Sequence, residues 1–408
     1  MNHHSGIRKQ PPLPPNRPPY LHLYYTYILF SFFFLFTIIL HNTMFPTFPL
    51  ALLALGASAI PTTPRNTNSI VERSREPGQL PLANGFPNVQ PGSSALLNIN
   101  KQAFGTLPDG QLPKEISDTS AVIWSLIAFN ELFEVAFFDS LITNITENVP
   151  GYEVGSPAAR TVVLSALSAV IAQEELHALG ANGILQTAGR KTISPCKYRF
   201  PVTNFDDAIA FTSTFTDVVL GTLQEAQTNF GIAGDGPKFV GLVGSVIGQE
   251  GEQNGFFRSM SSLAKVPSAK PFLTASSGAF AFSALQQLVI VPGSCPDKLP
   301  LPTFEALTIK TPKISAKTEE IEFTFNCNGQ DANNLRIVLI SGQNVPIVQK
   351  FTSHKTVGNV ITAKAPFPYA KFQLDGLTIA AITTSEGPFA NATEVAGKTL
   401  AGPGLIEI

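Results

Sequence analysis

The stretch AQEELHALGANGIL, residues 172–185, contains an E-x-x-H pair, Glu174 and His177, within a strongly apolar segment. Side chains three and four positions apart lie on the same face of an α-helix. The two polar residues therefore share one face with a stripe of apolar residues, which are Val163, Leu167, Val170 and Ala181. This spacing predicts a helix that turns a carboxylate and an imidazole toward the protein core.

Two other segments place acids on apolar stripes in the same way. Glu131 lies in FNELFEVAFF, residues 129–138, at helical spacing from large apolar residues. Glu250 and Gln253 do so in GQEGEQNGFF, residues 248–257. Burying an ionised carboxylate without a partner is costly. Inward acids on three helices therefore indicate a shared cation.

The predicted helix between residues 172–185 and residues 248–257 offers two acids. Asp217 lies on a polar stripe, whereas Glu225 continues an apolar one. The apolar stripe consists of Phe211, Phe215, Val218 and Thr222. Periodicity alone therefore favours Glu225 as the inward acid of this helix.

Ferritin-like helical bundles hold two iron or manganese ions with one Glu from each of two helices and a Glu-x-x-His pair from each of the other two. Glu134 and Glu175 are interpreted as groups that support such ligands or lie on the surface. The sequence predicts an iron or manganese site, with a metal-free hydrogen-bonded network as the alternative. The predicted ligands are Glu131, Glu174 with His177, an acid of the third helix, and Glu250 with Gln253.

Residues 118–295 resemble the secreted ferritin-like proteins of filamentous fungi, in particular the late sexual development proteins, which are related to fungal stress-response and plant desiccation-related proteins. The resemblance rests on the three quoted segments and on SPCKYRFPV, residues 194–202. It implies a four-helix ferritin-like fold, an extracellular location and a role in development or stress. On the third helix the family's ligand position falls on Asp217, against the periodicity. The other ligand positions fall on Glu131, Glu174, His177 and Glu250.

The chain departs from the family pattern at Gln253. The family has a histidine three residues after the fourth-helix acid, where this chain has a glutamine. Glutamine is a neutral and weak oxygen donor that does not supply an imidazole nitrogen. His177 is the only histidine between Ile60 and Cys295. A site with two histidines is therefore excluded in this region, whereas a site with one histidine is not.

Composition divides the chain after residue 59 into three parts. Residues 60–117 are rich in Pro, Gly, Asn and Ser, which is typical of a linker or a loosely wrapped arm. Residues 118–295 show helical spacing with Gly and Pro interruptions, which predicts four long helices. The sequence predicts an α+β fold, with a ferritin-like four-helix bundle followed by a small β-sandwich-like C-terminal domain. That domain, residues 296–408, contains β-branched runs at 321–325, 335–340 and 377–383.

Residues 1–59 have the pattern of a leader. Residues 21–40 form an uncharged apolar run that is long enough to span a bilayer. A second apolar stretch, residues 44–59, begins with Met44 and ends in an A-x-A cleavage pattern. This stretch predicts a signal peptide with Met44 as the start, whereas retention of residues 21–40 from Met1 makes a membrane anchor. Both interpretations direct the protein into the secretory pathway, toward the cell exterior or the cell wall.

Cysteines and sequons agree with an oxidising compartment. One disulfide is expected among Cys196, Cys295 and Cys327. Cys196 and Cys295 bracket the second half of the helical region, which favours their pairing, and the alternative is three buried free thiols. Asn144 and Asn391 each begin an N-x-T sequon, which predicts glycosylation of a secreted protein.

The 408 residues are 44% hydrophobic and 14% charged, with a net charge of -2 and no block of Lys or Arg. Binding to nucleic-acid phosphates needs clustered cations, so nucleic acid is excluded as a partner. Neither a G-x-S-x-G nor a G-x-x-x-x-G-K-[ST] motif occurs. We therefore favour a non-catalytic extracellular or cell-wall protein that contacts a partner there. The alternative is ferroxidase or peroxide-handling chemistry at a degenerate site with iron or manganese.

Overall fold

A computed structural model describes residues 76–261 and 265–408 of the protein. The predicted leader, with its apolar run and its signal peptide, lies outside the described residues, as does the first part of the predicted linker. The described residues combine long helices with antiparallel sheets. This combination confirms the predicted α+β class.

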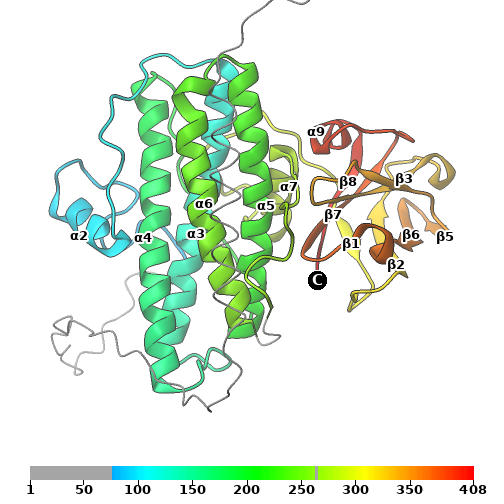
Figure 1. The fold of residues 1–408 in the computed structure, drawn as a ribbon, viewed down its shortest axis with the longest axis horizontal. Helices are drawn as coiled ribbons and strands as arrows, with labels where there is room; N and C mark the ends of the chain where they lie inside the picture. Colours follow the sequence, from blue (N-terminus) through cyan, green and yellow to red (C-terminus); the bar gives the residue numbers. More distant parts are fainter. Residues whose placement is uncertain (1–75, 262–264) are drawn as a thin grey trace, which may run out of the picture. The chain divides into compact units, whose positions relative to one another are not determined.

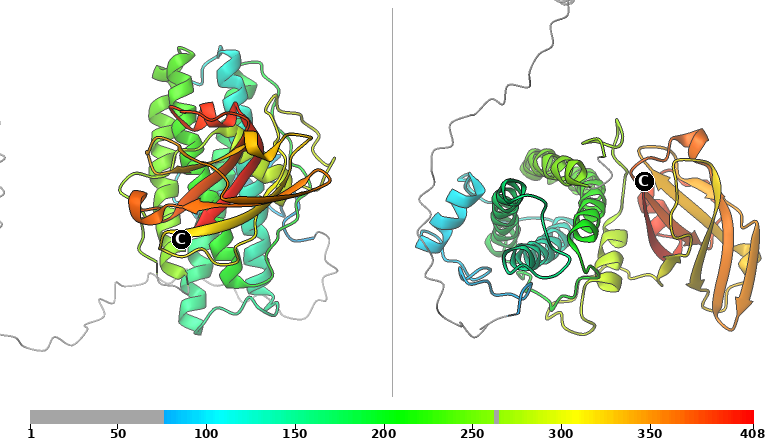
Figure 2. Two further views of the ribbon diagram at one scale, coloured as in Figure 1. Left: turned by 90° about the vertical axis from the view of Figure 1, so that its right-hand side faces the viewer. Right: turned by 90° about the horizontal axis from the view of Figure 1, so that it is seen from below.

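Four long helices pack side by side, and Figure 2 (right) shows them end on. Three of them begin at a polar cap: Ser117, Ser156 and Asn204 each accept a hydrogen bond from a backbone N–H of the next helix. Such caps satisfy N–H groups that have no partner within the helix. The four helices are α3 (Asp118–Thr146), α4 (Pro157–Thr187), α5 (Phe205–Ile232) and α6 (Gly236–Met260), as labelled in Figure 1.

Helix α3 is buried along most of its length and contacts the other helices through aromatic rings. The ring centroid of Trp124 lies 5.5 Å from that of Phe230 in α5 and 5.1 Å from that of Phe239 in α6. Phe133 lies 5.2 Å from Phe215 in α5, again between centroids. Because burial of a large apolar side chain contributes about 1.5–3 kcal/mol, these contacts hold α5 and α6 against α3.

Among the described helices, α3 and α4 are long and apolar enough to cross a membrane by length and composition. Their most apolar windows are 78% and 50% buried within the protein itself. A core helix has the same composition as a membrane span, because both avoid water. Packing against neighbouring helices therefore accounts for the apolar character of both.

Part of the predicted linker is folded onto the helices. Helix α2 (Ser94–Ala103) packs on α4, with Ile99 against Ala172 and Leu176 in one small cluster. The backbone N–H of Gly78 donates to the carboxylate of Asp139 in α3 at 2.8 Å. Of the two interpretations of residues 60–117, these contacts favour an arm that wraps around the helices over a free linker. Short helices in Pro- and Gly-rich surroundings depend on tertiary contacts rather than on their own propensity.

The end of the helical part is tied to the loop that follows α4. Cys196 and Cys295, which are 99 residues apart, form a disulfide. This is the pair that their positions favoured. Helix α7 (Gly278–Leu288) leads into this connection. A cross-link across such a long loop restricts the unfolded chain and so stabilises the fold.

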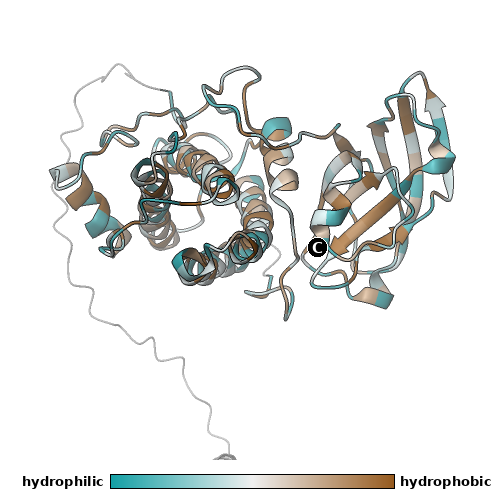
Figure 3. Ribbon diagram, turned by 90° about the horizontal axis from the view of Figure 1, so that it is seen from above, coloured by the Kyte–Doolittle hydropathy of each residue, from teal (hydrophilic) through white to brown (hydrophobic). Residues whose placement is uncertain are grey.

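The C-terminal part consists of two four-stranded antiparallel sheets that share one apolar core. Figure 3 shows hydrophobic residues, in brown, along these strands. The runs predicted from sequence fall on β2, β3 and β7. The first sheet has the order β1 (Leu307–Ile309), β2 (Glu319–Asn326), β6 (Val360–Phe367), β5 (Ser353–Val357), and the second has β4 (Ile347–Gln349), β3 (Arg336–Ser341), β7 (Leu377–Thr383), β8 (Thr399–Glu407).

Strands β3 and β7 are buried on both faces. One face of these strands points into the core between the sheets. The other face, which carries Val338, Ile340 and Ile379, packs against Phe280 of α7. A strand that is buried on both faces reads as a continuous apolar run rather than an alternating one. Three short elements complete the described fold: η1 (Ala332–Asn334), α8 (Tyr369–Phe372) and α9 (Ala392–Ala396).

Candidate metal centre

Four side chains from three helices converge inside the helical part. They are Glu131 of α3, Glu174 and His177 of α4, and Glu250 of α6, and one ligand atom from each lies within 4.8 Å of the others. The three glutamates are at most 1% exposed, and His177 is 18% exposed. The structure thus brings together the carboxylates that the sequence placed on three separate stripes.

The imidazole of His177 lies among the three carboxylates. Its Nδ1 is 2.8 Å from Glu174 Oε2, 3.6 Å from Glu131 Oε2 and 3.9 Å from Glu250 Oε1. The shortest of these contacts is a hydrogen bond within α4, because Glu174 and His177 are three residues apart and lie on one face. The E-x-x-H spacing therefore places both side chains on one face of α4, as predicted.

Gln253 contacts the group as a hydrogen-bond donor. Its Nε2 donates to Glu174 Oε1 at 2.7 Å and to Gln173 Oε1 at 3.1 Å. Gln249, one turn earlier in α6, also donates to Gln173, at 3.0 Å. The amide of Gln253 thus holds the Glu174 carboxylate in place.

Three buried carboxylate oxygens in this group have no hydrogen-bond partner among the described residues. They are Glu131 Oε2 and both oxygens of Glu250. Most buried polar atoms in proteins are hydrogen-bonded, because an unpartnered one loses its hydration without compensation. Unpartnered acceptors that surround one point are what a cation needs as ligands.

Without a cation, burial shifts these groups away from their ordinary protonation states. Burial raises the pKa of Glu131 to about 7, although His177 acts in the opposite direction. Burial also raises the pKa of Glu250 well above its usual range, and Glu131 and Glu174 add to the shift. Both carboxyls are therefore proton-bound in mildly acidic solution.

Glu174 and His177 behave as an ion pair. Burial favours a neutral Glu174, but the charge and hydrogen bond of His177, with the amide of Gln253, outweigh it and lower the pKa of Glu174. Burial likewise favours a neutral His177, but Glu174 and Glu131 outweigh it and raise the pKa of His177 well above its usual range. The positive charge of His177 balances the negative charge of Glu174. Among the described residues, no second positive side chain balances the carboxyls of Glu131 and Glu250.

Three further acids on the same helices have different surroundings. Glu134 is buried beside the group, where burial first and then Glu174, Glu131 and Glu250 raise its pKa. Glu175 is also buried, and it accepts a hydrogen bond from Asn84 Nδ2 at 2.9 Å. Neither is a surface group, which corrects one of the two interpretations given above. Glu252 is exposed on α6.

Neither predicted acid of the third helix belongs to the group of four. Asp217 is buried in α5, where Arg258 and Asn254 act on its carboxylate. Glu225 accepts a hydrogen bond from the Gly278 backbone N–H at 2.6 Å, at the start of α7. Helical spacing shows which way a side chain points but not how far along the bundle it lies. The sequence therefore could not decide which acid, if either, reaches the group.

A small cavity lies beside Glu131, and the described residues of α5 that line it carry no carboxylate. The residues of α5 that line it are Val219, Thr222 and Leu223. The hydroxyl of Thr222 donates to the carbonyl of Val218 within the helix at 2.8 Å. The group of four is therefore built from α3, α4 and α6.

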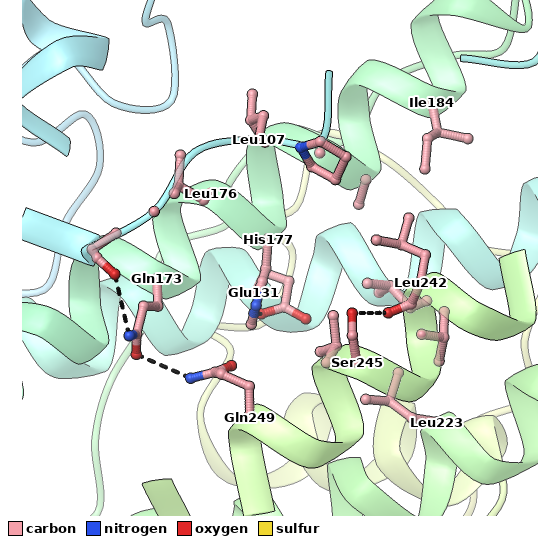
Figure 4. Close-up of a pocket in the computed structure, with 18 of the residues that line it drawn as sticks. Leu107, Glu131, Gln173, Leu176, His177, Ile184, Leu223, Leu242, Ser245 and Gln249 are labelled. Atoms are coloured by element: carbon pink, nitrogen blue, oxygen red, sulfur yellow. Dashed lines mark hydrogen bonds and ion pairs between the residues drawn. The ribbon is translucent and has the colours of Figure 1, made fainter. Parts of the chain in front are cut away.

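A larger cavity adjoins the group between α4 and α6, with a volume of about 280 Å³ (Figure 4). Glu131 and His177 form part of its lining, and most of the remaining lining is apolar. Figure 4 shows both side chains among Leu107, Leu176 and Leu242. No feature of the sequence taken alone indicated this cavity, because it depends on the separation of two helices.

The two predicted glycosylation sites differ in exposure. Asn391 is exposed, and its side-chain oxygen caps α9 by accepting the N–H of Glu394 at 2.9 Å. Asn144 is half-buried in the last turn of α3 and hydrogen-bonds to Tyr152. An exposed amide is the more accessible acceptor, so glycosylation stays a prediction that is better suited to Asn391.

No protein-family model matches the chain, and no curated protein matches it. The described residues contain four long packed helices and a buried group of three carboxylates and one imidazole that can hold a metal ion.

Proposed function

We propose that this protein is a secreted ferritin-like metalloprotein that holds iron or manganese between α3, α4 and α6. The observation that carries the proposal is the set of unpartnered, buried carboxylate oxygens of Glu131 and Glu250, which lie beside the imidazole of His177. Among the residues that the structure describes, no Lys or Arg pairs with this group. A metal ion is the partner that such acceptors lack.

The spacing of the group supports this proposal. Nitrogen and oxygen ligands bind a divalent ion such as zinc at about 2.0–2.2 Å, so two ligands on opposite sides are at most about 4.4 Å apart. The four ligand atoms lie within 4.8 Å of one another. Small side-chain rotations are enough to bring them to bonding distance of one ion.

The donor set fits iron, manganese or zinc better than calcium, magnesium or copper(I). Calcium and magnesium prefer oxygen ligands only, and copper(I) prefers sulfur. Three carboxylates with one imidazole suit iron, manganese or zinc. A redox-active ion here would supply ferroxidase or peroxide-handling chemistry.

The residues around the ligands would position them and restrict water. The Gln253 amide donates to Glu174 and leaves the other oxygen of that carboxylate toward His177. The apolar lining of the adjoining cavity keeps the group in a poorly hydrated environment, where electrostatic interactions are stronger. Glu134, buried nearby, adds a fourth carboxylate. Four ionised carboxylates would balance the charge of two divalent ions.

A second candidate is a non-catalytic extracellular or cell-wall protein with a role in development or stress, in which the group is an inherited network. The observation that favours it is Gln253, which hydrogen-bonds Glu174 directly where the family pattern has an imidazole. In this case the contacts with a partner belong to the rest of the protein. The family resemblance supports both candidates equally.

Metal content separates the two candidates. The protein is secreted from a eukaryotic host, kept from chelators and from nickel resin, and its metals are counted by plasma mass spectrometry. We expect about one to two equivalents of iron or manganese per chain. Glu250→Gln, which replaces a buried ligand, should lose this metal, whereas Glu252→Gln, at an exposed position two residues away, should keep it. An empty wild-type protein, or equal metal in both variants, would contradict the proposal.

A further inference from the structure

Helix α2 packs against the turn of α4 that carries two of the candidate metal ligands (Figure 1). The contact is an apolar cluster of four residues, which are Ile99 and Ala103 of α2 and Ala172 and Leu176 of α4. Glu174 and His177 each follow one of the two α4 residues closely in the sequence. Because an α-helix has about 3.6 residues per turn, α2 covers one side of this turn and the ligands lie on the opposite side, facing the bundle.

Gln173 lies between these two sides of the turn and hydrogen-bonds in both directions. Its Nε2 donates to the carbonyl of Ala103, the last residue of α2, at 3.4 Å. Its Oε1 accepts a hydrogen bond from Gln253 Nε2 of α6 at 3.1 Å. Gln249 Nε2 donates to the same oxygen at 3.0 Å, and a dashed line marks this bond in Figure 4. The amide of Gln173 therefore connects α2 to α6.

The same hydrogen bonds continue from Gln253 to the candidate metal ligands. Gln253 Nε2 also donates to Glu174 Oε1 at 2.7 Å, and Glu174 Oε2 lies 2.8 Å from His177 Nδ1. A side-chain amide has its donor and its acceptor on different ends. The bond from Gln173 to α2 therefore turns the oxygen of Gln173 toward α6. That oxygen and the Glu174 carboxylate then accept both hydrogens of the Gln253 amide nitrogen, which fixes the orientation of this amide.

We infer that Gln173 is a positioning residue that couples the docking of α2 to the Glu174 carboxylate, so that docked α2 raises the affinity of the metal site. When α2 leaves α4, Gln173 is free to turn its NH2 group toward Gln253, and two donors that face each other form no hydrogen bond. Gln253 then loses the acceptor that directs its nitrogen toward Glu174. The metal part of this inference rests on the proposed function. Coupling between two sites is reciprocal, so bound metal should also hold α2 in place.

Hydrogen exchange of α2 tests the coupling in the metal-free protein. Gln253→Met removes an amide that hydrogen-bonds to Gln173 and Glu174 and not to α2 itself. Residues 94–104 should nevertheless exchange their amide hydrogens about threefold faster in this variant. Gln227→Met is the matched control, because Gln227 also donates across two helices, to the carbonyl of Val240 at 2.8 Å, but away from α2. Unchanged exchange of α2 in Gln253→Met would overturn the inference.

Manganese(II) affinity tests the metal part of the inference. Gln173→Met should weaken manganese(II) binding about tenfold, as is typical when a group that positions a ligand is lost. Gln102→Met is the control, because Gln102 also ties α2 to α4, through the carbonyl of Ser168 at 2.7 Å, but takes no part in the bonds to Glu174. It should leave the affinity close to that of the wild type. The electron paramagnetic resonance signal of free manganese(II) gives both affinities, and equal losses in the two variants would overturn the assigned role of Gln173.

The reciprocal effect separates this inference from the proposed function. Bound manganese(II) should slow the exchange of α2 in the wild type and in Gln102→Met but not in Gln173→Met, a pattern that a merely structural role of Gln173 does not produce. Manganese(II) binding that leaves α2 exchange unchanged in the wild type would overturn the inference alone. A wild type that binds no manganese(II) would contradict the metalloprotein proposal. In that case the exchange of α2 in metal-free Gln253→Met still decides whether α2 is coupled to Glu174.

Discussion

The protein contains two groups of acids that have different partners. At the candidate metal centre, carboxylates from α3, α4 and α6 have one imidazole between them. In the second group, Asp217 of α5 and Glu407 of β8 lie near Arg258 of α6, which is 4% exposed and binds Glu407 at 2.9 Å. Lys265 lies 3.7 Å from Glu407 as well. Cations of the chain itself therefore surround the second group of acids.

The difference between the two groups is whether the fold supplies cations to its acids. Where the fold supplies guanidinium and ammonium groups, carboxylates join parts of the structure, here α6 and β8, although burial still raises the pKa of Glu407 to about 7. Where it supplies almost none, the carboxylates stay proton-bound or bind a cation from outside. Within the described part of the chain, Glu407 Oε2 is the one buried oxygen of the second group without a hydrogen-bond partner, against three at the metal centre. Five experiments test this contrast.

The largest effect is expected from Arg258→Met. It leaves Asp217 and Glu407 buried without their main cation, which should lower the free energy of unfolding by about 3–5 kcal/mol. Denaturant unfolding measures this change. Lys317→Met is the control, because Lys317 forms an exposed pair with Glu319 at 3.9 Å, and its loss should cost less than about 1 kcal/mol. Equal costs for the two variants would break the comparison.

Glu250→Gln should act in the other direction on the metal-free protein. Removing an unpartnered buried acid should leave stability unchanged or slightly raised, because glutamine carries no charge to desolvate. The same change should weaken metal binding by at least about 100-fold, or roughly 2.7 kcal/mol. Unfolding of the metal-free protein and a metal titration measure the two effects. A large loss of stability without metal would mean that Glu250 has a partner in the fold.

The metal-free protein should lose stability as the pH rises from about 5 to 8. Glu131 binds its proton with a pKa of about 7 in the folded state, above the ordinary value that applies when unfolded, so in this range the folded state holds more protons. Stability then falls with pH, by on the order of 1–2 kcal/mol. Bound metal displaces the proton of Glu131 and should reduce the slope. Burial raises the pKa of Glu175 and Glu407 to about 7 as well, so these two acids should keep part of the slope. Thermal unfolding against pH, with and without metal, provides the measurement.

Gln253→His should strengthen metal binding about tenfold, because it adds an imidazole three residues after Glu250. It also removes the hydrogen bond to Glu174, which limits the gain. Competition with a chelator of known affinity measures the change. Weaker metal binding by the variant would contradict this prediction. It would mean that the hydrogen bond from Gln253 to Glu174 contributes more to metal affinity than a second imidazole does.

The smallest effects are expected from the third helix. Glu225→Gln should cost at most about 1 kcal/mol, because it removes a charge near the first N–H groups of α7. Asp217→Asn changes the second group and not the first. Neither variant should change the metal content, which plasma mass spectrometry would show. Loss of metal in either variant would mean that the replaced acid is a metal ligand.

Much of the fold followed from local pattern. The apolar stripes predicted the long helices, and the β-branched runs predicted strands at β2, β3 and β7. Helix α2 was missed, because its ten residues depend on Ile99 and Ala103 packing against α4. The predicted pair Cys196 and Cys295 forms a disulfide in the structure.

The sequence by itself determined which acids face inward on α3, α4 and α6, because helical periodicity gives the direction of each side chain around the axis. It also determined that His177 is the only histidine between Ile60 and Cys295. Only the tertiary structure decided which acids meet. A helix of 28 residues such as α5 has about eight turns, and packing alone sets which turn lies beside the group. For that reason Asp217 lies near Arg258, Glu225 accepts a hydrogen bond from the first N–H of α7, and neither belongs to the group around His177.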